Sequence, residues 1–165
     1  MSSLNLERVC EHEAGHFYVA YKYRPARAIS TCISQERQLD ADSGKQYLSS
    51  GRTMTFDPDD ALPKVQVSFR AAGLAAESLV YDESFEDLKG SSAVRFRSKT
   101  DTDNAKADLR KAGLYPCPED EFIAFFCRLG FDDAVCILRD RLEKVRNIAA
   151  YCLAIWVGTS RNQKF

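Results

Sequence analysis

Apolar residues recur with helical spacing along most of the chain and predict a mainly helical fold. The first such segment covers about residues 4–23 and ends before Pro25, because the residue that precedes a proline avoids the helical region. A second helix is predicted to begin at Pro63 and to extend to about Tyr81. Residues 82–99 lack this period, so we expect them to be mostly loop.

Three further helices are predicted in the second half of the chain. They cover about residues 102–112, about residues 118–130, and a last segment that begins at Asp132 or Asp133 and extends as far as Trp156. The apolar residues of this last segment, from Val135 to Cys152, keep helical spacing throughout, which predicts one long helix.

Only the region after the first helix favours β-structure. Residues 28–34 are rich in β-branched side chains, residues 51–56 alternate weakly, and a polar loop at residues 35–45 separates them. We interpret the two pieces as a short hairpin or small sheet. The expected fold is therefore mainly α, a compact helical bundle with one small β-hairpin or sheet, in a single domain of residues 1–165.

The composition is that of an ordinary globular protein and argues against several classes of function. The chain has 23 Lys and Arg against 24 Asp and Glu, a balance that does not suggest a nucleic-acid partner. The longest apolar stretch, residues 148–158, is well short of the ~20 residues that a membrane span needs. Six cysteines without a CxxC pair favour reduced thiols over disulfides. We therefore expect a cytoplasmic protein, or one from the reducing interior of an organelle.

Candidate chemistry is concentrated in residues 12–16, which read His-Glu-Ala-Gly-His. His12 and His16, the only two histidines, are four residues apart, so in a helix both imidazoles lie on one face and can reach one zinc ion. Glu13 is rotated from His12 by about 100° around the helix, which places it beside the metal rather than on it. There it can act as general base toward the water that the metal activates. The pattern therefore predicts a zinc hydrolase site.

The alternative is that the short pattern arose by chance and that both histidines are structural. Two imidazoles and a carboxylate on a largely buried helix need partners, because burying unpaired polar groups costs free energy, and a metal would supply one. A catalytic zinc usually has three protein ligands. Since there is no third histidine, the remaining ligand must be a carboxylate or a cysteine, and spacing alone does not choose among 24 carboxylates.

Three segments follow one another in an order that suggests a family. They are VCEHEAGHFYVA at residues 9–20, AGLAAE at residues 72–77 and SKTDTDNAKA at residues 98–107. Together they resemble the metallopeptidase domain of FtsH-type proteases over about residues 4–112. The second segment departs from the family, whose glycine is followed by an arginine where this chain has Leu74.

The resemblance implies that an aspartate of the third segment is the third zinc ligand. Carried over, this role falls on Asp103, four residues before Ala107, with Asp101 as the near alternative. Both aspartates could instead be helix caps. The resemblance also makes Glu77 a carboxylate that lines the site or supports a ligand, and the alternative is an exposed position on its helix.

The leading hypothesis is a zinc-dependent metalloendopeptidase of the HExxH type. The chain has no GxxxxGK[ST] motif, so we expect it to hydrolyse short or unfolded peptides without ATP. The main rival is a catalytically idle, peptidase-like binding or regulatory module that docks on a related ATP-driven protease, although the intact Glu13 argues against it. A metal-free structural protein ranks last. The expected partner is a peptide or unfolded protein, and self-association and association with an ATPase both stay open.

Overall fold

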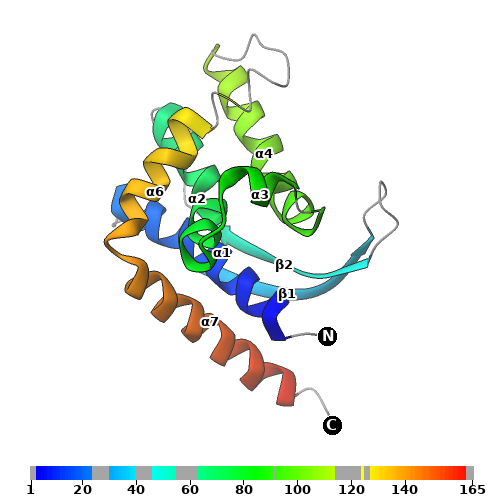
Figure 1. The fold of residues 1–165 in the computed structure, drawn as a ribbon. Coiled ribbons are helices and arrows are strands. Elements are labelled where there is room, and N and C mark those ends of the chain that lie inside the picture. The colour runs from blue at the N-terminus through cyan, green and yellow to red at the C-terminus, as the bar shows by residue number, and fades with distance from the viewer. Residues whose placement is uncertain are drawn as a thin grey trace.

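The computed structural model describes residues 3–23, 30–39, 46–54, 63–90, 92–113, 124 and 127–162. Its elements, in chain order, are α1 (Ser3–Tyr23), β1 (Ser30–Leu39), β2 (Gln46–Met54), α2 (Pro63–Tyr81), α3 (Phe85–Gly90), α4 (Ser92–Lys111), the π-helix η2 (Cys127–Phe131), α6 (Asp132–Arg139) and α7 (Leu142–Asn162) (Figure 1). The described part of the chain is therefore mainly α, as predicted. None of its helices is long and apolar enough to cross a membrane.

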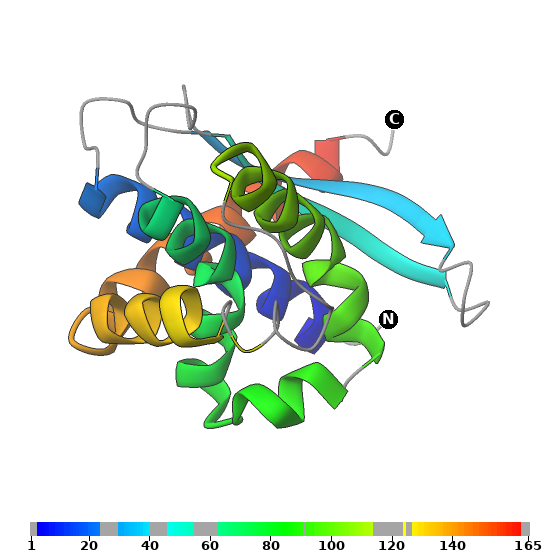
Figure 2. The same cartoon turned by 90° about the horizontal axis from the view of Figure 1, so that it is seen from above.

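Two helices form the centre of the fold, and the other elements pack around them. Helix α1 packs against α2 on one side and against α7 on another, while α4, η2 and α6 contact α2. The antiparallel strands β1 and β2 extend along α1, and both contact it. Seen from above, α4 and the strands lie on the same side of α1 (Figure 2). This arrangement brings α1, α2, α4 and β2 together, and these four elements carry the candidate site.

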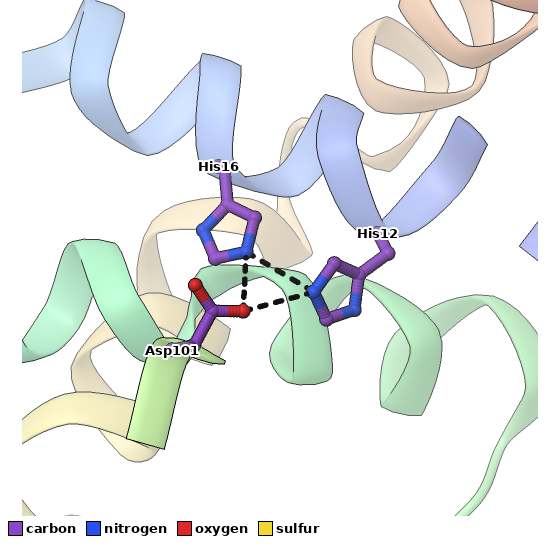
Figure 3. A group of neighbouring side chains, drawn as sticks. All are labelled: His12, His16 and Asp101. Carbon is purple, nitrogen blue, oxygen red and sulfur yellow. Dashed lines mark hydrogen bonds and ion pairs between the residues drawn. The ribbon is translucent and has the colours of Figure 1, made fainter. Parts of the chain in front are cut away.

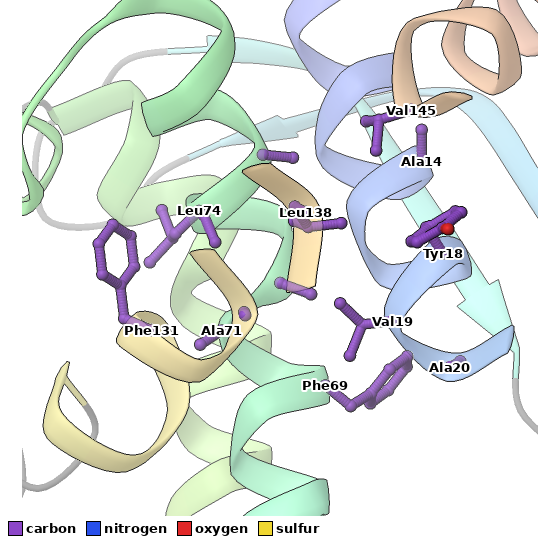
Figure 4. Packing of buried hydrophobic residues seen from close by; sticks show 14 of the residues in the cluster. Ala14, Tyr18, Val19, Ala20, Phe69, Ala71, Leu74, Phe131, Leu138 and Val145 are labelled. Carbon is purple, nitrogen blue, oxygen red and sulfur yellow. The ribbon is translucent and has the colours of Figure 1, made fainter. Parts of the chain in front are cut away.

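Small residues allow α1 and α2 to approach closely. A β-carbon added at Gly15 would lie 2.4 Å from the carbonyl oxygen of Ala72 and 2.6 Å from Cβ of Ala76, so the two helices touch at this glycine. Around this contact the buried core extends to α6 and α7 (Figure 4). Its fully buried members include Ala14, Val19, Ala71, Ala75, Leu138 and Val145. Because His12 and His16 flank Gly15 in sequence, the same contact presses both imidazoles against α2.

The strands are longer than the sequence indicated. Strand β1 continues through Leu39, so the prediction of loop at residues 35–45 is wrong for residues 35–39. Strand β2 begins at Gln46 rather than at Gly51 and ends at Met54. Many residues of both strands are polar, so the pattern of apolar residues did not predict their full length. Backbone pairing holds the two strands together, with an irregularity between Ser34 and Arg37.

The region between α2 and residue 113 is more helical than predicted. Instead of a loop at residues 82–99, the chain forms α3 and then α4, which begins at Ser92 and not at Thr102. A cap at the start of α3 explains part of this difference. Ser84 Oγ donates a hydrogen bond to Asp87 Oδ2, and the Asp87 amide donates to Ser84 Oγ over 3.2 Å, which satisfies groups at the helix start.

The predicted last helix is two helices. Helix α6 ends at Arg139, and α7 begins at Leu142, with a turn in which the Arg141 amide donates to the Leu138 carbonyl over 2.9 Å. Apolar spacing did not reveal this break, because the buried residues Leu138 and Val145 stand seven apart on either side of it. Most of the helix predicted at residues 118–130 lies outside the described residues, and its end forms η2.

Candidate metal centre

Three side chains from two helices converge at the centre of the fold (Figure 3). His12 and His16 come from α1, each is 3% exposed, and their Nε2 atoms are 3.1 Å apart. Asp101 comes from α4, and its Oδ2 lies 3.2 Å from His12 Nε2 and 3.1 Å from His16 Nε2. The three atoms therefore form a nearly equilateral triangle.

This triangle is close in size to one face of a tetrahedral zinc site. Zinc binds imidazole nitrogen and carboxylate oxygen at about 2.0–2.2 Å, which separates neighbouring ligand atoms of a tetrahedron by roughly 3.3–3.6 Å. The observed separations of 3.1–3.2 Å are slightly shorter than this range. Two imidazoles and one carboxylate are also a donor set that zinc accepts. The residues present therefore fit the metal that the sequence motif predicted.

Hydrogen bonds on the far side of each imidazole determine which nitrogen faces the triangle. His16 Nδ1 lies 2.7 Å from the Phe69 carbonyl oxygen, which only accepts, so this nitrogen carries the proton. His12 Nδ1 lies 2.9 Å from Glu77 Oε1, and we assign its proton in the same way. Both Nε2 atoms then present lone pairs toward Asp101. Three acceptors so close together are stable only when a proton or a cation lies among them.

The electrostatics of the cluster favour positive charge. Burial lowers the pKa of His12, but its hydrogen bonds with Asp101 and Glu77 and the charges of both carboxylates raise this pKa to about 10. Burial raises the pKa of Asp101, but the two imidazoles hold it well below its usual range through charge and hydrogen bonds. The centre thus keeps its carboxylate ionised and attracts a cation.

The aspartate in the centre is Asp101, and the prediction that Asp103 faces the histidines is wrong. The Asp103 side chain is 56% exposed, and its Oδ2 accepts a hydrogen bond from Lys99 Nζ over 3.1 Å. The two aspartates diverge because two residues of helix rotate a side chain by about 200°. The resemblance placed the ligand at Asp103 by its spacing to Ala107, and a helix that began at Thr102 would also have made Asp101 a cap. Since α4 begins at Ser92, Asp101 is inside the helix and free to face α1.

A signal in the sequence could have distinguished the two aspartates. Each precedes an alanine by four residues, but Ala105 is fully buried whereas Ala107 is exposed. Leu109, four residues beyond Ala105, is 1% exposed. Asp101, Ala105 and Leu109 therefore continue one face of α4 at helical spacing, and Ala105 and Leu109 belong to the buried core.

Glu77 supports the centre from α2. Its side chain is fully buried, which excludes the alternative of an exposed helix position. While Oε1 meets His12 Nδ1, Oε2 lies 4.0 Å from Arg8 Nη1. Arg8 also donates to Glu83 Oε1 over 2.6 Å and lies 4.0 Å from the centre of the Tyr81 ring. Arg8 thus places a positive charge beside the buried carboxylate and lowers the free-energy cost of burying it.

Glu13 follows His12 of the candidate metal triad (His12, His16 and Asp101) in sequence and contacts a residue that the sequence did not identify. The glutamate is 5% exposed. Thr53 of β2 donates from Oγ1 to Glu13 Oε2 over 2.6 Å, and the same oxygen is 3.2 Å from the Glu13 carbonyl oxygen. No motif connects positions 13 and 53, and only the packing of β2 on α1 brings them together.

The described residues contain one group of three side chains that could hold a metal ion, namely His12, His16 and Asp101. A comparison of the chain with family models of known proteins finds no match, and a comparison with curated protein sequences finds none either. The geometry of this centre and the His-Glu-Ala-Gly-His motif are therefore the observations that bear on function.

Proposed function

We propose that the chain is a zinc-dependent peptidase in which His12, His16 and Asp101 hold the metal and Glu13 is the general base. The observation that carries the proposal is the convergence of three acceptor atoms within 3.1–3.2 Å of one another, with a buried glutamate next in sequence to the first ligand. Satisfied structural histidines need no such triangle, since each imidazole already has a partner at Nδ1.

The protein's own groups prepare the two imidazoles for this role. The Phe69 carbonyl and the Glu77 carboxylate hold the Nδ1 protons and orient both rings, which leaves the Nε2 lone pairs for the metal. A bound zinc ion would supply Lewis acidity, which activates water and polarises the carbonyl group of a peptide bond. Zinc also fits better than magnesium or calcium, which prefer sites made only of oxygen ligands.

Glu13 performs the proton transfers in this proposal. Its carboxylate takes a proton from the attacking water and later gives it to the amine that leaves when the peptide bond breaks. In the described part of the chain, the contact with Thr53 involves Oε2, so we assign the proton transfer to Oε1. Burial of Glu13 keeps bulk water away and strengthens its interaction with the reacting groups.

Short or unfolded peptides are the proposed substrates. The chain contains no nucleotide-binding P-loop motif, so it is not expected to unfold a protein with ATP. Strand β2 reaches the site at Thr53, and an extended peptide could add to an edge of this two-stranded sheet by backbone hydrogen bonds. Such a peptide would be held close to Glu13 and the metal triad.

Cleavage of an unstructured, fluorescence-quenched peptide tests the proposal. We expect the zinc-loaded chain to cleave it, chelator to stop the cleavage, and ATP to leave the rate unchanged. Glu13→Gln should retain zinc but lose at least about 100-fold in rate, because it removes the base and not a ligand. Binding of the peptide without cleavage by the zinc-loaded wild type would instead favour an idle binding module.

A further inference from the structure

We propose that Thr53 is a positioning residue for the general base, which it holds in the orientation that proton transfer requires. This inference rests on the proposed peptidase function, because it assigns Thr53 a role in the same site. The contact joins helix α1 to strand β2 across 40 positions of sequence. In the described part of the chain, this hydrogen bond connects the Glu13 carboxylate to the sheet.

The position of the Thr53 hydroxyl is determined by the strand. Thr53 lies opposite Thr31 in the antiparallel register of β1 and β2, so backbone pairing fixes its α-carbon. A β-branched side chain has few accessible rotamers, which further limits where its hydroxyl can lie. From there Oγ1 reaches Glu13 Oε2 over 2.6 Å, a distance typical of a hydroxyl that donates to a carboxylate.

Glu13 needs such a partner more than a surface glutamate does. It is 5% exposed, so water cannot easily replace the threonine hydroxyl. A glutamate side chain also has three rotatable bonds, and His12, the first residue of the metal triad, precedes Glu13 in sequence. A carboxylate released from Thr53 could therefore turn toward the metal and bind it, and a metal-bound carboxylate no longer serves as base. The hydroxyl keeps Glu13 in its catalytic role.

Kinetics of the zinc-loaded full chain test this role. Thr53→Val keeps the shape of the side chain but removes the hydroxyl, and Thr53→Ser retains the hydroxyl as the matched control. We expect Thr53→Val to lower kcat by about 10- to 100-fold with little change in KM, while its zinc content stays that of the wild type. Thr53→Ser should recover most of kcat. A purely structural contact would leave kcat unchanged in every folded variant.

A thermodynamic cycle in metal-free protein provides a readout that does not depend on activity. Unfolding free energies are measured for wild type, Thr53→Val, Glu13→Ala and the double variant. We expect the double variant to lose less stability than the sum of the single losses, because both substitutions break the same hydrogen bond. Additive losses would overturn the inference.

The outcomes separate this inference from the function on which it rests. A wild type that binds zinc but cleaves no peptide would contradict the proposed function and, with it, the role of Thr53. A wild type that cleaves the peptide, with Thr53→Val equally active, would overturn the role of Thr53 alone.

Discussion

Gly73 of α2 lies directly beneath the imidazole of His12. A β-carbon at position 73 would be 2.3 Å from His12 Nε2 and 2.4 Å from Cε1, far inside contact distance. The ring therefore rests on the backbone of α2, and the absence of a side chain at this position leaves room for it. The geometry of the candidate metal centre thus depends on a glycine, which has no side chain to contribute a ligand or a hydrogen bond.

Gly73→Ala should therefore displace His12 and weaken zinc binding by at least about 10-fold, since ligand orientation controls affinity. The fold should survive, because the clash is with one imidazole ring. Gly15→Ala is the contrasting variant, because its β-carbon would meet the backbone of α2 at Ala72 and force the helices apart. Thermal melting and zinc titration of both variants test this difference. Unchanged zinc affinity in Gly73→Ala would contradict the contact.

Glu77 should control zinc affinity through His12. Glu77→Gln removes the charge that supports the imidazole, and we expect zinc affinity to fall by about 10- to 100-fold. Glu83→Gln is the matched control, because Glu83 shares Arg8 with Glu77 but has no described contact with His12. Competition with a zinc-sensitive dye gives both affinities. If both variants lose the same zinc affinity, the loss comes from the disturbed contacts of Arg8 and not from the missing support of His12.

Zinc should stabilise the folded chain by mass action. If zinc binds only the folded state, a free concentration of 100 times Kd adds about 2.7 kcal/mol, which for a chain of this length raises Tm by roughly 5–10 °C. A chelator should reverse the shift without unfolding the protein, because the buried core does not depend on the metal. Differential scanning calorimetry measures both effects, and the same Tm with zinc and with chelator would contradict a metal site.

A second, partly buried network of hydrogen bonds predicts that stability depends on pH in the alkaline range. Tyr23 and Ser68 both donate to Asp133 Oδ2, over 2.6 and 2.7 Å, and so connect α1, α2 and α6. Burial, together with the hydrogen bond to Asp133, raises the pKa of Tyr23 to about 12, against about 10 for a free tyrosine. The folded state thus favours the protonated phenol. Its contribution to stability is complete below pH 10 and is lost as the pH rises toward 12.

Tyr23→Phe removes this contribution. At pH 8 we expect the variant to be less stable than wild type by about 1 kcal/mol, the value of one hydrogen bond. The gap should narrow as the pH rises above 10. Tyr21→Phe, on an exposed side chain of the same helix, should show neither effect. Urea unfolding at pH 8, 10 and 11 measures the gap, and a constant gap for Tyr23→Phe would show that its phenol does not ionise differently on folding.

The sequence predicted the parts of the site that lie within one helix. His12, Glu13 and His16 belong to a single turn of α1, so helical geometry alone was enough to place them on neighbouring faces. Asp101 was harder, because both aspartates precede an alanine by four residues, and the start of α4 at Ser92, which excludes a capping role for Asp101, has no strong signal in the sequence. Thr53 and the Phe69 carbonyl could not have been predicted, since only tertiary packing of β2 and α2 on α1 brings them to the site.

The same difference applies to the fold. Helices α1 and α2 were predicted with nearly the observed bounds, because proline positions and a continuous apolar pattern define them. The break between α6 and α7 was missed, because the turn at residues 140–141 keeps the apolar residues in register. A break between two helices cannot be predicted from apolar spacing alone when the spacing continues across it.

The proposed metal site is tested by the zinc content of wild type, Asp101→Asn and Asp103→Asn, measured by mass spectrometry of dialysed protein and by titration of the metal-free chains. The assignment of His12, His16 and Asp101 as ligands predicts about one zinc per chain for wild type, a loss of affinity of at least about 100-fold for Asp101→Asn, and wild-type affinity for Asp103→Asn, because Asp103 pairs with Lys99 at the surface. Loss of zinc from Asp103→Asn with retention by Asp101→Asn would contradict it, as would a wild type that binds no zinc.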